Sequence, residues 1–303
     1  MKQIKQIVVP LTAILLAAGA QAQTKIAIEG QAYVINSTQN ANVNGTLRYE
    51  WYRNNVLIPE CTAATCTVPA NLCNGTNIVF VRKVVATGGC AGDTEGFSNT
   101  VTVTFICGGG HGTKIGNVCW ANRNVGAAGA FTATAHEYSP FYQFNRNRAW
   151  AAQGAIEQGA PNGWNYYEYD HSGEGWTITP HPCPTGWRLP TQEECEALVN
   201  SGSTWRLAHA CGNAVAGRFF GPNHAACTFP DNMTSCVFLP ASGVRSGPYG
   251  AIDRYGNSGY GFFWASPHYW DDEDADSFEF SSTYTDAGTS SYRANGFSIR
   301  CVQ

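Results

Sequence analysis

Alternating hydrophobic and polar positions in the first third of the chain predict short β-strands. Three segments carry this signal by period-two alternation or β-branched side chains: 46–52 (TLRYEWY), 78–85 (IVFVRKVV) and 98–105 (SNTVTVTF). Asn54 and Asn55 predict a turn before a further apolar run at 56–58. Short strands at this spacing, separated by Asn, Gly and Pro, predict an all-β sandwich over residues 23–106.

The remainder of the chain has a different pattern. The glycine-rich run at 107–112 (CGGGHG) lacks the side chains that fix a backbone, and we interpret it as a linker. Beyond it, residues 113–303 predict short strands and long structured loops. One helix is expected to begin at Thr191, with Glu194 in the capping-box position and Gly202 at its end. A second helix is a weaker expectation over residues 141–153.

The first residues predict export from a bacterium. Lys2 and Lys5 precede an apolar run at 7–18, and the Ala20-Gln21-Ala22 pattern places signal-peptidase cleavage before Gln23. The run is too short for a permanent membrane anchor, so we expect no transmembrane segment in the mature chain. The protein is therefore expected to be secreted or held on the outer surface.

All 12 cysteines follow the predicted cleavage site. An even number of cysteines in an exported chain indicates disulfides, because the compartment oxidises thiols. Zinc is the alternative, since His209 and His224 lie near Cys211, Cys227 and Cys236, but the paired C-x-x-C spacing of structural zinc is missing. We expect sulfur bridges, and not a large apolar interior, to fix the loops of the C-terminal half.

Composition narrows the function further. Charged residues make up 13% of the chain and aromatic residues another 13%, which excludes a disordered protein. No basic patch typical of nucleic-acid binding is present. The 281 residues left after cleavage are enough for two domains.

A series of landmarks in the second region resembles a known family. They are IGNVCWANRNV (115–125), FYQF (141–144), CPTGWRLPTQEE (183–194), FLPASGVR (238–245), GFFWAS (261–266) and GFSIRCV (296–302). The series resembles the Fibrobacter succinogenes major paralogous domain, over residues 113–303. The resemblance implies an α+β, disulfide-rich domain of the C-type-lectin-like fold, with variable loops that carry a binding surface.

The same landmarks contain residues with an expected structural role. A disulfide between Cys183 and Cys301 would close a long loop, with a chain-entropy contribution of about 4 to 5 kcal/mol. Arg188 and Arg300 are interpreted as donors to local carbonyls or carboxylates, in preference to an oxyanion clamp. In the first region, YEWYRNNVLI resembles the segment around the buried tryptophan of immunoglobulin-like and PKD-like domains. That resemblance implies a core role for Trp51 and a spacer or assembly role for the domain.

An acidic stretch is the first candidate site. Trp270 is followed by Asp271, Asp272, Asp274 and Asp276, whose carboxylates repel one another, and a calcium ion would relieve that repulsion. The carbohydrate-binding triplets of calcium-dependent lectins are missing, as is the EF-hand spacing. We therefore favour a solvated acidic loop over a calcium site.

Clustered aromatic side chains are the second candidate site. Tyr166, Tyr167, Tyr169 and Trp176 lie among Asn, Gly and acidic residues, together with Trp164. Exposed aromatic faces stack on sugar rings, although the same residues also serve to cover a loop-rich core. For Trp164, which follows a probable Asn-Gly turn, we favour the core role.

These observations rank three functions. The first is a cell-surface or secreted recognition or adhesion protein, which binds a glycan or a protein through lectin-like loops. The second is a structural subunit of a pilus (fimbrium) or surface assembly, joined by edge-strand pairing. The third is an enzyme related to the sulfatase-modifying fold, with Cys227 and Cys236 in a redox role. We expect no enzymatic activity, because no G-x-S-x-G or H-E-x-x-H pattern occurs.

Overall fold

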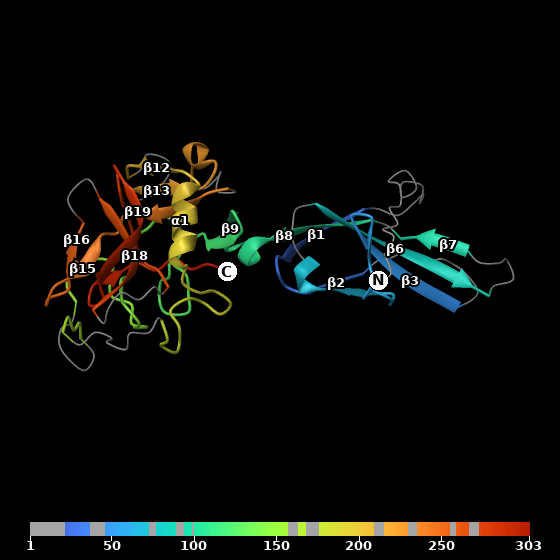
Figure 1. Cartoon of the computed structure of the whole chain (residues 1–303), viewed down its shortest axis with the longest axis horizontal. Coiled ribbons are helices and arrows are strands. Elements are labelled where there is room, and N and C mark those ends of the chain that lie inside the picture. Colours follow the sequence, from blue (N-terminus) through green and yellow to red (C-terminus); the bar gives the residue numbers. More distant parts are fainter. Residues whose placement is uncertain are drawn as a thin grey trace, which may run out of the picture. The chain divides into compact units, whose positions relative to one another are not determined.

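The computed structural model of the chain divides into two compact units, with the boundary between Gly110 and His111 (Figure 1). It describes residues 22–36, 46–72, 77–88, 94–98, 100–156, 163–167, 176–208, 215–229, 235–254, 259–266 and 273–303. Residues 1–21 of the predicted leader (1–22) therefore lie outside the described residues. Within those residues, no helix is both long enough and apolar enough to cross a membrane.

The N-terminal unit is a two-sheet β-structure. Its strands are β1 (Gln23–Ile28), β2 (Tyr33–Ile35), β3 (Thr46–Arg53), β4 (Val56–Ile58), β5 (Cys66–Val68), β6 (Ile78–Thr87), β7 (Thr94–Phe97) and β8 (Val101–Ile106), with a short 3-10 turn, η2 (Ala70–Leu72). One sheet has the order β1-β8-β6-β3-β4, with β7 also paired to β6, and the other pairs β2 with β5. β1 runs parallel to β8, whereas the other pairs are antiparallel. The strands predicted at 46–52, 56–58, 78–85 and 98–105 are confirmed, with ends shifted by a few residues.

The turn between β3 and β4 shows why its sequence is Asn-Asn. Asn54 and Asn55 have φ angles of 45° and 68°. Asparagine tolerates this left-handed region better than other non-glycine residues, and two successive positive φ values match the twist of a tight hairpin. The side chain of Asn54 also accepts a hydrogen bond from the Val79 N–H at 2.9 Å, which ties the turn to β6.

The core of this unit lies between its two sheets and is centred on Trp51. Trp51 is fully buried among apolar residues of both sheets, and its indole N–H donates to the Ala63 carbonyl at 2.9 Å. The buried guanidinium of Arg82 lies over the Tyr49 and Trp51 rings, 5.3 and 5.9 Å from their centroids. The predicted core role of Trp51 is confirmed.

The glycine-rich run forms a 3-10 turn and not only an extended connection. This turn, η3 (Cys107–Gly110), has φ angles of 58° at Gly108 and 64° at Gly109, where a Cβ would strain the backbone. Gly112 already belongs to the first strand of the next unit. Gly108 and Gly109 are therefore needed for the left-handed backbone conformation of this turn.

The C-terminal unit consists of short strands, one α-helix and long connections. Its elements are β9 (Gly112–Ile115), β10 (Val118–Ala121), β11 (Tyr142–Gln143), α1 (Gln192–Asn200), β12 (Ser203–Arg206), β13 (Gly217–Phe220), η4 (His224–Ala226), β14 (Val237–Pro240), β15 (Val244–Ser246), β16 (Ala251–Asp253), β17 (Tyr260–Trp264), β18 (Asp274–Ser281), β19 (Thr285–Tyr292) and β20 (Gly296–Phe297). The sheet orders are β10-β9, β11-β20-β15-β16, β12-β13-β14 and β17-β18-β19. α1 packs on β18 and β19 (Figure 1).

Helix α1 begins as its sequence predicts. Thr191 accepts a hydrogen bond from the Glu194 N–H, and the Glu194 side chain accepts one from the Thr191 N–H at 2.9 Å. This reciprocal pair is a capping box, which satisfies two N–H groups that the helix leaves without internal partners. Ser201 caps the other end, and Gly202 follows with φ of 95°.

The helix expected over residues 141–153 is wrong. This segment turns back on itself, because the backbones of Phe141 and Trp150 exchange two hydrogen bonds of 2.9 and 2.8 Å. Asn145, with φ of 52°, stands in the left-handed region within the loop. Its side-chain oxygen accepts from the N–H groups of Thr177 and Ile178, both at 2.8 Å. A tertiary contact therefore overrides the local helical pattern.

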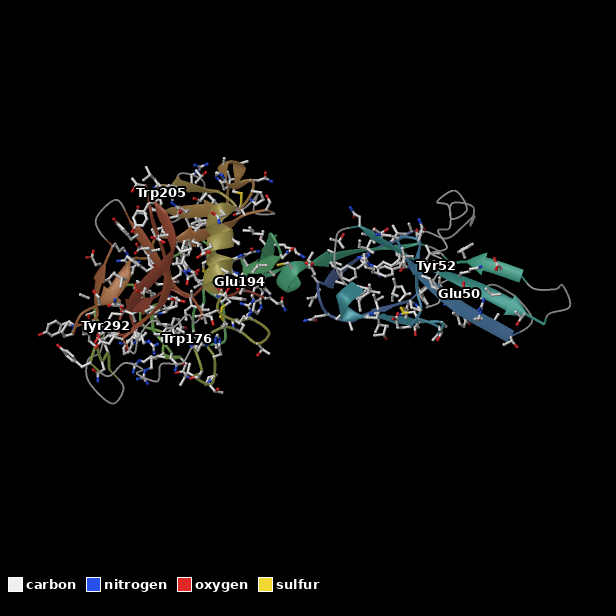
Figure 2. The ribbon with its side chains drawn as sticks, viewed as in Figure 1. Glu50, Tyr52, Trp176, Glu194, Trp205 and Tyr292 are labelled. Atoms are coloured by element: carbon white, nitrogen blue, oxygen red, sulfur yellow. A yellow bond between two sulfur atoms is a disulfide. The ribbon has the colours of Figure 1, made fainter. Side chains whose placement is uncertain are left out.

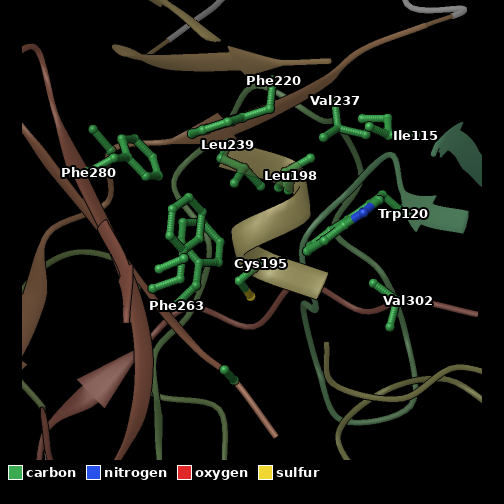
Figure 3. Close-up of a cluster of buried hydrophobic side chains, with 14 residues drawn as sticks. Ile115, Trp120, Cys195, Leu198, Phe220, Val237, Leu239, Phe263, Phe280 and Val302 are labelled. Atoms are coloured by element: carbon green, nitrogen blue, oxygen red, sulfur yellow. The ribbon is translucent and has the colours of Figure 1, made fainter. Parts of the chain in front are cut away.

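A large apolar interior fills the C-terminal unit, contrary to our expectation. One cluster packs α1 against β13, β14, β17 and β18, with Leu198 and Cys195 of the helix among aromatic rings (Figure 3). A second cluster gathers around Trp264, which is fully buried. Two aromatic rings pack against Trp264 there: the ring centroid of Phe297 lies 4.3 Å from that of Trp264, and the centroid of Phe144 lies 5.4 Å from it. Hydrophobic burial therefore stabilises this unit together with its disulfides.

The predicted disulfide between Cys183 and Cys301 is confirmed. It joins residues 118 positions apart, with the Cα atoms 6.0 Å from each other. Cys227 and Cys236 form another disulfide, so these two cysteines are not zinc ligands, and His224 contacts the Thr204 hydroxyl.

Cys195 departs from the expectation that cysteines of the chain pair as disulfides. It is a free, buried thiol on the core side of α1. Burial, together with nearby carboxylates such as those of Glu194 and Asp276, raises the pKa of its thiol. The remaining described cysteines are disulfide-bonded. Cys61 pairs with Cys66, and Cys107 and Cys119 each form a disulfide as well. Cys73, Cys90 and Cys211 lie outside the described residues.

Candidate binding site

The candidate site is built on Trp164, which is 1% exposed. Its indole N–H donates to the Gly247 carbonyl at 2.9 Å, and its ring packs edge-on against Trp150 at 5.6 Å. Glycines face the ring on two sides: a Cβ would lie 2.8 Å from it at Gly250 and 3.1 Å from it at Gly296. Trp164 therefore joins three chain segments, and the favoured core role is confirmed.

A buried amide holds the backbone next to Trp164. The side-chain NH₂ of Gln143 donates to the carbonyls of Asn165 and Ala294, at 2.8 and 2.9 Å. The Asn165 side chain in turn accepts from the Tyr167 N–H at 3.0 Å. These bonds fix the segment 163–167 against the turn that follows β19, so the next tyrosines extend from a rigid base.

Arg245 secures the same base from the other side. Its buried guanidinium donates to the carbonyls of Ala151, Gly154 and Gly250, at distances between 2.6 and 2.9 Å. One planar group thus donates to three loop carbonyls. Burial lowers the pKa of this guanidinium, with a smaller effect from Arg254, but an arginine remains charged at neutral pH.

Tyrosine rings surround this base. Tyr166 contacts the ring of Tyr167 at 5.8 Å and that of Tyr292 at 5.2 Å. Tyr249 lies in the turn between Gly247 and Gly250 that Trp164 contacts, and Tyr249 and Tyr167 are each 71% exposed. We call these four residues the tyrosine rim; Tyr292 is labelled in Figure 2. Burial and the neighbouring tyrosines raise the pKa of Tyr166, so its hydroxyl is neutral at physiological pH.

The other aromatic candidates are placed differently. Trp176 is half-buried against Phe144 and His181, at ring distances of 5.0 and 6.3 Å, so it contributes to the interior (Figure 2). Its indole nitrogen is buried and has no hydrogen-bond partner among the described residues. Tyr169 and Trp270 lie outside the described residues.

The acidic stretch is not a solvated loop where the structure describes it. Asp274 and Asp276 belong to β18, and Asp276 is only 2% exposed. Asp271 and Asp272 lie outside the described residues. In the described ranges, no group of three or more His, Cys, Asp or Glu side chains is arranged to hold a metal ion. β18 still brings this segment to the rim, because Asp274 pairs with Tyr292.

Two rim residues were not identified from the sequence. Tyr249 stands in the short turn Gly247-Pro248-Tyr249-Gly250, and Tyr292 ends a strand of polar and small residues. Neither position has a local signal for a binding surface. Tyr292 reaches the Tyr166 ring, and the turn of Tyr249 reaches Trp164, because Gln143 and Trp164 connect segments more than 80 positions apart.

Arg188 and Arg300 have the structural roles favoured above. Arg188 forms a two-bond ion pair with Glu194, at 2.7 and 2.6 Å, beside the start of α1. Arg300 is buried and donates to the Asn124 side chain and to the carbonyls of Ala121 and Phe238, at 2.6 to 2.7 Å. Neither guanidinium is directed to an open site by these bonds.

Fold and site together define a β-rich, disulfide-bonded protein with two compact units, the second of which displays an aromatic surface. A comparison with protein families identifies that second unit. The Fibrobacter succinogenes major domain matches residues 113–303, and the chain belongs to this family. No curated protein and no solved structure matches the chain.

Proposed function

We propose that the protein is an exported bacterial recognition or adhesion protein, which binds its partner through the tyrosine rim. The observation that carries the proposal is the position of Tyr166, Tyr167 and Tyr292 at the surface of a rigid base. A preorganised binding surface loses less conformational entropy on binding. Tyrosine also combines apolar ring area with a polar hydroxyl, which suits sugars and protein surfaces alike.

The two units have separate roles in this proposal. The C-terminal unit has a C-type-lectin-like fold and makes the contact with a glycan or a surface protein. The N-terminal unit, an immunoglobulin-like or PKD-like sandwich, acts as a spacer. Export follows from the leader pattern, so the mature chain begins at Gln23 and is secreted or retained on the outer surface. N-terminal sequencing of protein recovered from culture tests this part, and retention of Met1 would contradict it.

A glycan array tests the proposed binding directly. The wild type is expected to bind at least one glycan, and Tyr167→Ala is expected to weaken that binding roughly tenfold or more, since an exposed stacking ring is lost. Tyr284→Ala is the matched control: Tyr284 is 37% exposed and donates its hydroxyl to Glu279 at 2.9 Å, outside the rim. Arrays with calcium and with a chelator decide whether binding depends on calcium, as a calcium site at Asp271, Asp272, Asp274 and Asp276 would require. No binding under either condition would contradict glycan recognition.

Edge-strand assembly is the second candidate function, and β1 is the element that favours it. β1 is a six-residue strand at the edge of its sheet, and Ile26 is 69% exposed. Unpaired edges accept strands from other chains, although Lys25 beside Ile26 opposes such pairing. In this function, filaments would form from the purified protein and Ile26→Lys would abolish them. A wild type that stays monomeric at high concentration would contradict it.

A further inference from the structure

The angles between the rings of the tyrosine rim restrict what it can bind. Tyr166 and Tyr167 are inclined at 87° to each other, and Tyr166 and Tyr292 at 54°. A flat ligand surface lies face-on against two rings only when the rings are parallel. Neither of the other two rings is parallel to that of Tyr166, so Tyr166, Tyr167 and Tyr292 do not form one continuous plane.

The contacts of Tyr166 oppose realignment of these rings. Tyr166 is half-buried, and its two ring contacts hold it between Tyr167 and Tyr292. The backbone on either side is fixed by the bonds of Trp164 and Asn165. Coplanar rings would require Tyr166 to give up its edge-on contact with Tyr167 and to move within a half-buried position.

We infer that the tyrosine rim, if it binds glycans as proposed above, takes a single soluble glycan chain or a chain end, and not the flat face of an insoluble polysaccharide. A single chain has sugar rings that rotate about each glycosidic bond. Successive sugars can then turn to meet Tyr167, Tyr166 and Tyr292 in different orientations. A crystalline polysaccharide presents one fixed plane, which can lie face-on against only one of these three rings.

The experiment compares soluble and insoluble forms of the same sugars. Soluble cello-, chito-, manno- and xylo-oligosaccharides are measured by calorimetry beside the glycan array. Pull-down uses powders of cellulose, chitin, mannan and xylan. We expect binding to a soluble glycan, a roughly tenfold loss in Tyr167→Ala, and recovery in Tyr167→Trp, because tryptophan restores a ring. The powders are expected to retain no more protein than they retain of Tyr167→Ala.

The outcomes separate this inference from the proposed function. Tyr167-dependent retention on a powder, with no binding of soluble sugar, would overturn the inference and leave glycan recognition in place. Binding to neither form would overturn both. Binding to soluble sugar that Tyr167→Ala and Tyr292→Ala leave unchanged would also overturn the inference, since the site would then lie elsewhere. Thermal unfolding of each variant confirms that it is folded.

Discussion

The two compact units of this chain differ in how their buried backbone groups are hydrogen-bonded. In the N-terminal unit most of these groups pair along strands, of which β3 and β6 share eight paired residues. In the C-terminal unit the described strands other than β18 and β19 have two to five residues, and buried arginines donate to main-chain carbonyls as well. Arg218, Arg245 and Arg300 each donate to two or more main-chain carbonyls.

This difference explains why only one unit carries the candidate site. A strand ladder leaves little freedom to vary the backbone, because each residue is paired with a neighbour. A loop that is held by a guanidinium keeps an irregular course and can still be rigid. Arg245 holds the loop at 247–250, and Gln143 holds the segment 163–167 in a similar way. The tyrosine rim therefore stands largely on irregular segments that are nevertheless rigid.

Removal of the disulfide between Cys183 and Cys301 should give the largest effect. We expect the free energy of unfolding of the C-terminal unit to fall by about 4 to 5 kcal/mol in Cys183→Ala/Cys301→Ala, since the bridge spans 118 positions. Tryptophan fluorescence in urea measures it, because eight of the nine tryptophans lie in this unit. Cys61→Ala/Cys66→Ala removes a bridge between residues only five positions apart. It should lower the free energy of unfolding of the N-terminal unit by about 2 kcal/mol and leave the unfolding transition of the C-terminal unit unchanged. Equal losses would contradict the comparison.

Truncation of Trp51 tests whether the N-terminal unit unfolds separately. Trp51→Ala should destabilise that unit by about 3 to 5 kcal/mol, because it leaves a cavity and orphans the Ala63 carbonyl. Hydrogen exchange should then show lost protection in β3 and β6, with protection of α1 and β18 retained. Loss of protection in both units would show that they fold as one.

Arg300→Met probes the arginine-held loops. It should destabilise the C-terminal unit by about 3 kcal/mol, since three buried acceptors lose their donor. Urea unfolding followed by tryptophan fluorescence measures the change, and Arg146→Met, at an exposed position, serves as the control. If both variants unfold at the same urea concentration as the wild type, the guanidinium is not a main support of this unit.

The helix cap should give the smallest effect, and one that depends on pH. Burial raises the pKa of Glu194, but Arg188 and the Thr191 N–H outweigh it, so the pKa lies below its ordinary value. The charged carboxylate therefore stabilises the fold above the unfolded-state pKa, and this contribution is lost as pH falls through the native pKa. Glu194→Gln should cost about 1 kcal/mol at pH 7 and nothing at strongly acidic pH. A difference that persists in acid would contradict the assignment.

Local sequence determined the parts of this protein that depend on near neighbours. Period-two alternation predicted β3 and β8, and β-branched side chains predicted β6. Thr191 with Glu194 predicted the start of α1, because helix capping acts over a few residues. The resemblance in the landmarks gave the pairing of Cys183 with Cys301. Tyr166 and Tyr167 were found as candidates from composition alone.

Tertiary structure decided the rest, because the deciding contacts join distant positions. Arg300 lies 176 and 179 positions from two of its partners, and no local pattern records such a bond. The segment 141–153 forms a loop and not a helix, because the Asn145 side chain accepts hydrogen bonds from residues 32 and 33 positions away. Tyr292 joined Tyr166 in the same way, through loop carbonyls held by a buried side chain, and so the candidate surface was completed only by the fold.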